Sequence, residues 1–375
     1  MATEFVSDWS CLPGDVLALV CPLLGGDAPA ARLACTAWSS WLVPAVDHLA
    51  IGRGYHPRLT SLFLSGARSL SVSSGGRFRF GDAPPPGAFR SLERLAFDRP
   101  EADTTWTRLV RALPHHGRVR DLVLTSATSL TRQQFHDVAS LTSLTRLELI
   151  DTPILSDGWY AFGLLSKLAG LTSLTIDTRS HDIEDDGMLA LCGMTKLTSL
   201  AIFCEGEGIC YAEDGLLALG GLTGLTALRL RGDEIACNDD VLFAVSELSL
   251  LKTLDIQISQ SATYDGFASL TKLELVEELH LRTHWTNFGR IQHEIQDLSG
   301  FRALERVSLA CSGCVHHALK AFAQLPTLKH IDVTFTSGVR RDLNDLLSPL
   351  FRGHGSGDPA LPLLSIHYSN DPPPQ

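Results

Sequence analysis

The segment CSGCVHH, residues 311–317, holds the densest group of side chains that could do chemistry. Cys311 and Cys314 lie three residues apart, a spacing at which two thiolates can share a tetrahedral zinc ion. His316 and His317 could complete such a site, or one of them could activate a cysteine as a nucleophile. No second CxxC pair and no matched pair of histidines is evident elsewhere in the chain. We therefore expect no metal ion and no other cofactor.

Recurring Asp-Gly pairs are a second group of candidate catalytic residues. Their aspartates are Asp157, Asp186, Asp214 and Asp265. Because the pairs recur regularly before apolar segments, we interpret them as the starts of helices rather than as acid catalysts. The chain also lacks GxxxxGK[ST], GxSxG and HExxH motifs and any dinucleotide-binding fingerprint. We therefore expect a protein that is not an enzyme.

The composition indicates a folded protein that does not bind polyanions. Of the 375 residues, 45% are hydrophobic and 19% are charged, and the formal net charge is -11. A chain with this charge has no basic field to hold nucleic acid or an anionic membrane. The first ten residues, MATEFVSDWS, lack the features of a secretory signal, and no stretch is long and apolar enough to span a bilayer. We expect a cytoplasmic or nuclear location, with the nine scattered cysteines reduced.

A six-residue pattern with aliphatic residues at its first, fourth and sixth places recurs along the chain. Its copies are VRDLVL (119–124), LTRLEL (144–149), LTSLTI (171–176), LTSLAI (197–202), LTALRL (225–230), LKTLDI (251–256), VEELHL (276–281), LERVSL (304–309) and LKHIDV (328–333). LTSLFL (59–64), LERLAF (92–97) and LPLLSI (361–366) are interpreted as copies near the ends. The central copies are ~26 residues apart, a period typical of a repeat architecture.

Each repeat is predicted to contain a strand, a loop and a helix. Alternating apolar residues place one face of each strand in the core, and stacked strands share a continuous hydrophobic column. Segments 185–194 and 213–222 carry an Asp suited to a helix N-cap, followed by apolar residues at helical spacing. The sequence therefore predicts an α/β fold, a curved solenoid with parallel strands on its concave face and helices on its convex face.

Residues 59–366 resemble the leucine-rich repeats of the ribonuclease-inhibitor and cysteine-containing type. That family usually has Asn or Cys in the turn after the strand. Here Thr152 and Cys311 fall near this place, whereas other repeats carry residues such as Arg179. We expect the repeat domain with its end caps to cover residues 51–368, followed by a disordered tail over residues 369–375.

Two apolar segments precede the repeats. Residues 12–24 and 27–41 are predicted to form helices, with Pro13 and Pro29 in their first turns. A segment of about 40 residues rarely buries enough surface to be stable alone. Its apolar side chains must therefore cover either the first repeat, as a cap, or another protein.

The N-terminal segment resembles the F-box, a three-helix module that binds the adaptor subunit of an SCF-type cullin-RING ubiquitin ligase. The match comprises Leu12-Pro13, the apolar helix that follows, and then Asp27, Cys35 and Trp38. The resemblance implies an F-box over residues 8–50 and a substrate receptor whose repeats bind the protein to be ubiquitylated. The side chains expected to contact the adaptor are Leu12, Pro13, Val16, Leu17, Val20, Leu24 and Trp38. The alternative is a leucine-rich-repeat scaffold or inhibitor without a link to ubiquitin, whose N-terminal helices only cap the solenoid.

Side chains between the aliphatic positions of each strand point away from the core, so they are free to contact a partner. The candidates for substrate binding are Arg229, Arg231, Asp255, Gln257, His280, Arg282, Trp285, Phe288 and Arg306. Arginine and aromatic side chains are enriched at binding hot spots. The alternative interpretation is an ordinary solvated face whose charges pair with one another. The loop at residues 204–214, which contains Tyr211, is a second candidate.

Overall fold

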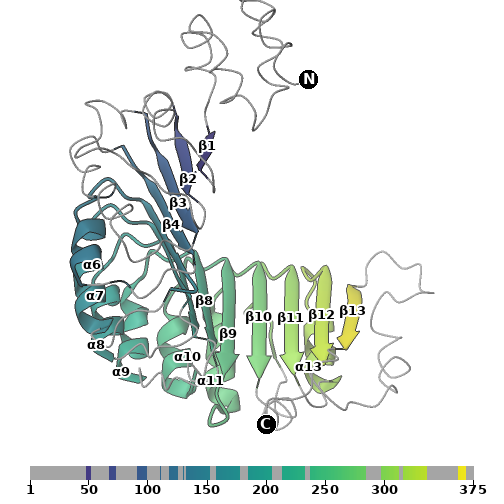
Figure 1. Ribbon diagram of the computed structural model, residues 1–375. Helices are drawn as coiled ribbons and strands as arrows, with labels where there is room; N and C mark the ends of the chain where they lie inside the picture. The colour runs from purple at the N-terminus through teal and green to yellow at the C-terminus, as the bar shows by residue number, and fades with distance from the viewer. Residues whose placement is uncertain are drawn as a thin grey trace, which may run out of the picture. The chain divides into compact units, whose positions relative to one another are not determined.

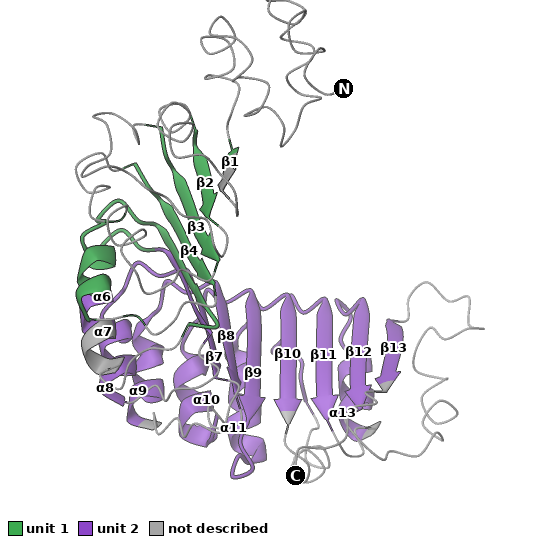
Figure 2. Ribbon diagram, in the orientation of Figure 1, with its two compact units in different colours: residues 1–153, 167–171 green, residues 154–166, 172–375 purple. Residues whose placement is uncertain are grey.

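The chain divides into two compact units (Figure 2). Unit 1 comprises residues 1–153 and 167–171, and unit 2 comprises residues 154–166 and 172–375. The computed structural model describes residues 48–51, 67–72, 91–98, 110, 118–125, 130, 132–152, 158–177, 185–204, 213–232, 237–283, 297–311, 316–335 and 362–368. The predicted adaptor contacts from Leu12 to Trp38 lie outside these residues, and so does the predicted tail.

Unit 1 is built on parallel strands that neighbour one another in chain order (Figure 1). Its described elements are β1 His48–Ile51, β2 Ser69–Val72, β3 Arg94–Asp98, β4 Asp121–Thr125, β5 Arg146–Ile150 and helix α6 Arg132–Ala139. Leu95, Leu122 and Leu147 are Cα partners on successive strands, and each is 0% exposed. Strand-to-strand stacking of these leucines forms the predicted hydrophobic column.

Unit 2 repeats the same arrangement with more strands. Its described strands are β6 Ser173–Asp177, β7 Ser199–Cys204, β8 Ala227–Gly232, β9 Thr253–Ile258, β10 Glu278–Thr283, β11 Arg306–Cys311, β12 His330–Phe335 and β13 Leu363–Tyr368. Its described helices are α7 Gly158–Leu165, α8 Asp185–Cys192, α9 Glu213–Leu217, η4 Ala218–Gly221, α10 Asp239–Ser246, α11 Tyr264–Ser269, η5 Leu270–Lys272 and α13 His316–Ala323. Helices α8 to α11 lie side by side along one side of the strands (Figure 1). None of the described helices has the length and apolar character needed to cross a membrane.

The predicted repeat register is confirmed in the central repeats. Leu197, Leu200 and Ile202 take the first, fourth and sixth places of one copy, and all three are 0% exposed. Leu200 is the Cα partner of Leu174 on one side and Leu228 on the other. The strands are parallel, as an α/β repeat requires, and each begins at the third place of its six-residue copy.

The predicted six-residue copies do not include the first two strands of unit 1. β1 (HLAI) and β2 (SLSV) join the ladder of unit 1, although neither was among the predicted copies. The copy proposed there, residues 59–64, lies outside the described residues. Around β1, VDHLAI (46–51) carries the six-residue pattern with Val46 in its first place, whereas in ARSLSV (67–72), around β2, alanine takes that place.

Aspartates at the helix starts lie in the first turn rather than at the N-cap. Asp185 and Asp186 begin α8, and the N-cap of α10 is Asn238, whose side chain accepts a hydrogen bond from Val241 N at 3.0 Å. The first-turn carboxylates instead reach the next repeat: Asp185 Oδ1 accepts from Gly215 N at 2.8 Å. A negative charge in the first turn also stabilises the helix, because it lies near the positive end of the helix dipole.

Glycines after these aspartates allow neighbouring helices to approach closely. A Cβ atom on Gly187 would lie 2.6 Å from Cδ2 of Phe162 in the preceding helix. A Cβ atom on Gly215 would overlap the Met188 side chain, and one on Gly266 would overlap the Asp239 carboxylate. The Asp-Gly pairs at Asp186, Asp214 and Asp265 are therefore helix starts, as predicted, and their glycines are contact points between repeats, whereas Asp157 lies outside the described residues.

Replacing Gly266 with alanine is expected to destabilise the protein by about 1–3 kcal/mol, because the new methyl group overpacks the contact with Asp239. Chemical denaturation of the purified variants measures the change. The control is Gly163→Ala in α7, where a Cβ atom meets nothing within 4 Å. That substitution is expected to stabilise the protein by about 0.5–1 kcal/mol through helix propensity. If Gly266→Ala does not lower the free energy of unfolding, the close contact between α10 and α11 is contradicted.

The position at the end of two strands holds a small buried side chain, a Cys as in the family pattern in one case and a Thr in the other. Thr152 is 0% exposed, and its hydroxyl donates to the carbonyls of Ile150 at 3.1 Å and Leu124 at 3.5 Å. Cys311, at the end of β11, is 2% exposed. A small side chain at this place therefore packs inside the turn of its repeat.

Candidate protein-interaction surface

Polar side chains on three neighbouring strands of unit 2 form one surface. We define the β8–β10 polar face as Arg229, Arg231, Asp255, Gln257, His280 and Arg282. Arg229, Asp255 and His280 occupy one row of Cα partners, and Gln257 is the Cα partner of Arg282. These positions alternate with core leucines such as Leu254, so their side chains lie on the opposite side of the sheet from the core. Six of the nine predicted substrate-binding residues are therefore brought together.

A buried ion pair lies at the centre of this face. Arg231 Nε donates to Asp255 Oδ2 at 2.8 Å, and Arg231 Nη2 contacts the same oxygen. The Asp255 side chain is 1% exposed, whereas that of Arg231 is 31% exposed. The guanidinium also lies 5.4 Å from the centroid of the Phe203 ring on β7, within cation–π range. The aromatic ring and the carboxylate together hold Arg231 in one orientation.

The second oxygen of Asp255 is not satisfied by the described residues. Asp255 Oδ1 is buried and accepts no hydrogen bond there. A buried acceptor without a donor costs about 1–3 kcal/mol. The residue lies between Arg229 and His280 in its row, on the side of the sheet that faces away from the core. Because this oxygen is inaccessible to solvent, it is a cost to the folded chain and not a contact for a partner.

Two arginines of the face carry uncompensated charge. Arg229 is exposed and Arg282 is half-buried, and neither makes an ion pair or hydrogen bond with the described residues. Arg306 on β11, which is also among the predicted substrate-binding residues, differs because its Nη1 lies 3.4 Å from Glu278 Oε1. Because Arg231 is neutralised by Asp255, the face has a net positive charge from Arg229 and Arg282. This charge contrasts with the net charge of -11 of the whole chain.

The remaining predicted substrate contacts are not placed. Trp285 and Phe288 follow β10, which ends at Thr283, and lie outside the described residues. The same holds for Tyr211 in the loop at residues 204–214. The aromatic side chain that the structure adds is Phe203, which sequence analysis did not select. Phe203 is the fifth residue of β7 and the Cα partner of Arg231 on β8. Aligning the two strands by their leucines could have identified it from the sequence.

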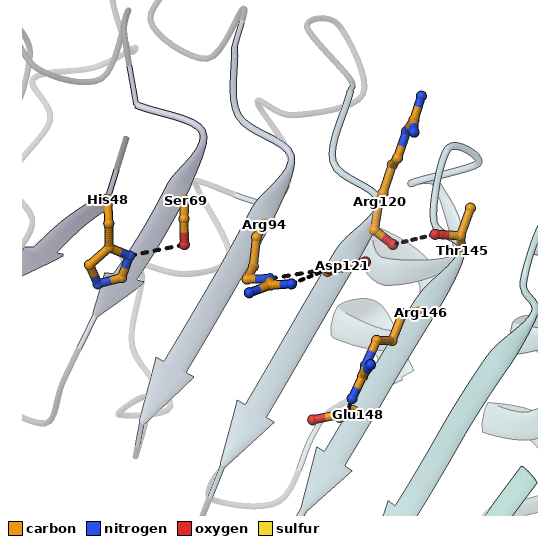
Figure 3. A network of polar contacts seen from close by, with 8 residues as sticks. All are labelled: His48, Ser69, Arg94, Arg120, Asp121, Thr145, Arg146 and Glu148. Atoms are coloured by element: carbon orange, nitrogen blue, oxygen red, sulfur yellow. Dashed lines mark hydrogen bonds and ion pairs between the residues drawn. The ribbon is translucent and has the colours of Figure 1, made fainter. Parts of the chain in front are cut away.

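The sheet face of unit 1 has polar contacts of a different kind (Figure 3). Arg94 Nε donates to Asp121 Oδ2 at 3.1 Å, and Arg146 pairs with Glu148 on the same strand. Near the edge, His48 Nδ1 lies 3.0 Å from Ser69 Oγ. The third place of the six-residue copies contains Arg94, Asp121 and Arg146, an alternation of charge that predicts cross-strand pairing.

Thr145 adds a further hydrogen bond to that network. Its hydroxyl donates to the Arg120 carbonyl at 3.3 Å (Figure 3). The two arginines Arg94 and Arg146 are thus paired with carboxylates of the same unit, in contrast to Arg229 and Arg282 of unit 2. Exposed pairs of this kind contribute about 0–1 kcal/mol each. Their chief consequence is that the unit 1 face has little free charge to offer a ligand.

The segment CSGCVHH spans the end of β11 and the start of α13. Cys311 is 2% exposed and lies in the turn described above, whereas Cys314 falls outside the described residues. Over the parts of the chain that the structure describes, no three His, Cys, Asp or Glu side chains are grouped as a metal site would require.

Burial suppresses the reactivity of two thiols in unit 2. It raises the pKa of Cys237 to about 12 and that of Cys192 to about 11, both from 9.0. Since the thiolate is the nucleophilic form, we expect iodoacetamide at about pH 8 to leave Cys237 unmodified in the folded chain. Peptide mass spectrometry before and after unfolding in urea measures this protection. Equal labelling of Cys237 in both states would contradict its buried position.

The same pKa shift predicts an alkaline loss of stability. The folded chain holds the Cys237 proton more tightly than the unfolded chain, so folding is favoured while the thiol is protonated. The stabilisation is complete below pH 9 and is lost as the pH rises toward 12. Denaturant midpoints measured across that range report the loss.

Comparison with known proteins identifies structural neighbours but no sequence relative. No protein-family model matches the chain. No curated protein matches its sequence either. An internalin of Listeria monocytogenes, InlF, is similar in structure with 13% identity and a TM-score of 0.45, covering 88% of each chain. TLR13 in its complex with ssRNA13 has 15% identity and a TM-score of 0.47, covering 79% of this chain and 48% of TLR13.

A leucine-rich-repeat protein of Leptospira interrogans is a further neighbour, with 12% identity and a TM-score of 0.37, covering 84% of this chain and 96% of its own. Within each unit of this chain, the repeats contribute parallel strands whose leucines join the core of that unit, and helices connect many of the strands. The described part of this chain therefore has the leucine-rich-repeat fold.

Proposed function

We propose that the chain is a substrate receptor of an SCF-type cullin-RING ubiquitin ligase. In this proposal, residues 8–50 bind the adaptor subunit, and the β8–β10 polar face binds the protein to be ubiquitylated. The observation that carries the substrate-binding half is the pair of uncompensated arginines, Arg229 and Arg282, beside the Arg231–Asp255 ion pair. A receptor of this kind has no catalytic residues of its own, because the chemistry belongs to the ligase.

The polar face has the physical properties of a recognition surface. Its side chains contribute nothing to the leucine core, so they are free to differ from repeat to repeat without loss of the fold. Arg231 is held in place by Asp255 and Phe203 before any partner arrives, which lowers the entropy cost of binding. Arginine is among the residues that contribute most to protein interfaces.

The adaptor-binding half rests on the sequence of residues 12–38. The two predicted helices carry more apolar side chains than a segment of this length can bury by itself. The ordered set Leu12-Pro13, Asp27, Cys35 and Trp38 matches the F-box, for which the adaptor covers those side chains. The adaptor is thus the partner we propose for them.

A leucine-rich-repeat scaffold without a link to ubiquitin is the second candidate. The β8–β10 polar face favours this function as strongly as it favours the first, since both require a protein ligand there. The two candidates differ only at the N-terminal segment. We propose a protein ligand rather than RNA in both cases, because a net charge of -11 opposes binding of a phosphate backbone.

Replacing Leu12 and Pro13 with alanine is expected to abolish capture of the adaptor subunit, since the pair begins the apolar surface that the adaptor would cover. A pull-down of the purified adaptor by the full chain, followed by immunoblotting, measures the loss. The thermal transition of the repeats should stay within a few degrees of the unsubstituted chain.

The matched control is Leu189→Ala in α8, a leucine that is 47% exposed on the repeats. This variant should capture the adaptor as well as the unsubstituted chain does. If the unsubstituted chain captures no adaptor, the ligase role fails and the scaffold candidate takes its place.

A further inference from the structure

We propose that the β8–β10 polar face binds an extended acidic segment of its protein partner, with two carboxylates of that segment on Arg229 and Arg282. The inference rests on the substrate-binding half of the proposed function and is independent of the ligase. Its basis is charge complementarity, because neither guanidinium makes an ion pair with the described residues, and the one carboxylate beside Arg229, that of Asp255, is paired with Arg231. Carboxylates are the partners that arginine binds with paired hydrogen bonds.

The distance between the two arginines determines how far apart the two acidic residues of the bound segment lie. Arg229 lies on β8 and Arg282 on β10, two strands apart and two residues out of register. At ordinary sheet dimensions their Cα atoms are about 12 Å apart. In an extended peptide, side chains four residues apart share one face and are separated by about 13 Å. The geometry therefore favours the pattern acid-x-x-x-acid.

Charge favours a polypeptide over a nucleic acid as the ligand. The formal net charge of -11 opposes binding of a phosphate backbone, which carries a negative charge at every nucleotide. An acidic segment with two carboxylates brings negative charge only to Arg229 and Arg282. Two cations on an otherwise acidic chain therefore fit a short acidic polypeptide.

The sheet face of unit 1 is the internal contrast. It also displays arginines, but Arg94 is paired with Asp121 and Arg146 with Glu148. A ligand carboxylate would have to displace a carboxylate that the chain already provides. The same arginine-to-glutamate substitution can therefore be made on both faces. On the β8–β10 polar face it replaces arginines without an ion pair, and on the unit 1 face it replaces arginines that already have one.

The test is selection from a random dodecapeptide phage library by the immobilised full chain. We expect the selected peptides to be enriched in pairs of acidic residues four positions apart. The variant Arg229→Glu, Arg282→Glu should capture those peptides at least about tenfold less well, a loss equivalent to ~1.4 kcal/mol. The variant Arg94→Glu, Arg146→Glu should capture them as the unsubstituted chain does.

Raising the salt from about 50 to 500 mM should weaken capture, because the contacts are charged and exposed. Thermal unfolding confirms that each variant is folded, and Arg229→Gln, Arg282→Gln replaces the charge reversal if that variant does not fold. The inference is overturned if no peptide is selected, if selected peptides lack acidic pairs, or if the reversed variant captures them equally. Stronger binding of single-stranded RNA than of the selected peptides would also overturn it.

Adaptor capture in the same preparation separates this inference from the proposed function. A chain that captures the adaptor but selects no acidic peptide keeps its ligase role and loses this partner class. A chain that selects acidic peptides but captures no adaptor retains the partner class and loses the ligase role.

Discussion

Leu200→Ala is expected to lower the free energy of unfolding by about 2–5 kcal/mol, the range for truncating a buried leucine. Leu200 is 0% exposed and lies in register between Leu174 and Leu228. Its truncation leaves a cavity in the middle of the leucine column. The flanking strands cannot move into this cavity without breaking their hydrogen bonds to the neighbouring strands. Because each repeat is stabilised by its neighbours, the loss should affect the whole of unit 2.

Urea denaturation followed by circular dichroism measures this loss. Leu189→Ala is the matched control, because Leu189 is 47% exposed and the same atoms are removed from a solvated position. That control should change stability by less than about 0.5 kcal/mol. A similarly small loss for Leu200→Ala would mean that the leucine does not lie in the core, and the repeat register would be wrong.

Arg231→Met is expected to destabilise the protein by about 3 kcal/mol, because it leaves the Asp255 charge buried without its counter-ion. The figure is at the lower end of the range for broken buried pairs, since Arg231 is 31% exposed and water screens part of the interaction. Loss of the cation–π contact with Phe203 adds to the effect.

A double variant separates the ion pair from the shape of the side chains. Arg231→Met combined with Asp255→Leu removes both charges and the unsatisfied oxygen together, so we expect it to recover most of the lost stability. Arg146→Met in unit 1 is the surface control, and its pair should contribute less than about 1 kcal/mol. A double variant no more stable than Arg231→Met alone would contradict the burial of an uncompensated charge.

The repeat geometry could be predicted because it depends on period and alternation. The copies from LERLAF to LPLLSI locate β3 to β13 to within a few residues, and the alignment of Arg229, Asp255 and His280 follows from their common place in each copy. The strand β1 was within reach of the same pattern, because VDHLAI (46–51) fits all three places, whereas ARSLSV (67–72) at β2 is less distinctive because alanine takes the first place.

Contacts between repeats could not be predicted from the sequence pattern, because the pattern describes each repeat separately. The overlap of a Gly266 Cβ atom with Asp239 depends on how closely α10 and α11 approach, which no single segment encodes. The unsatisfied oxygen of Asp255 likewise depends on which neighbours reach it in three dimensions. By contrast, the ion pair of Arg94 with Asp121 was predictable from the alternation of charge in successive copies.

Affinity purification of the full chain from cells, with identification of bound proteins by mass spectrometry, tests the central claim most directly. Three chains are compared: the unsubstituted one, Leu12→Ala with Pro13→Ala, and Arg229→Glu with Arg282→Glu. The account predicts that the first pair of substitutions removes the ligase adaptor and cullin but keeps the acidic partner, and that the second pair does the reverse. Absence of every cullin-RING subunit from the unsubstituted chain, or loss of both sets of proteins with either variant, would contradict it.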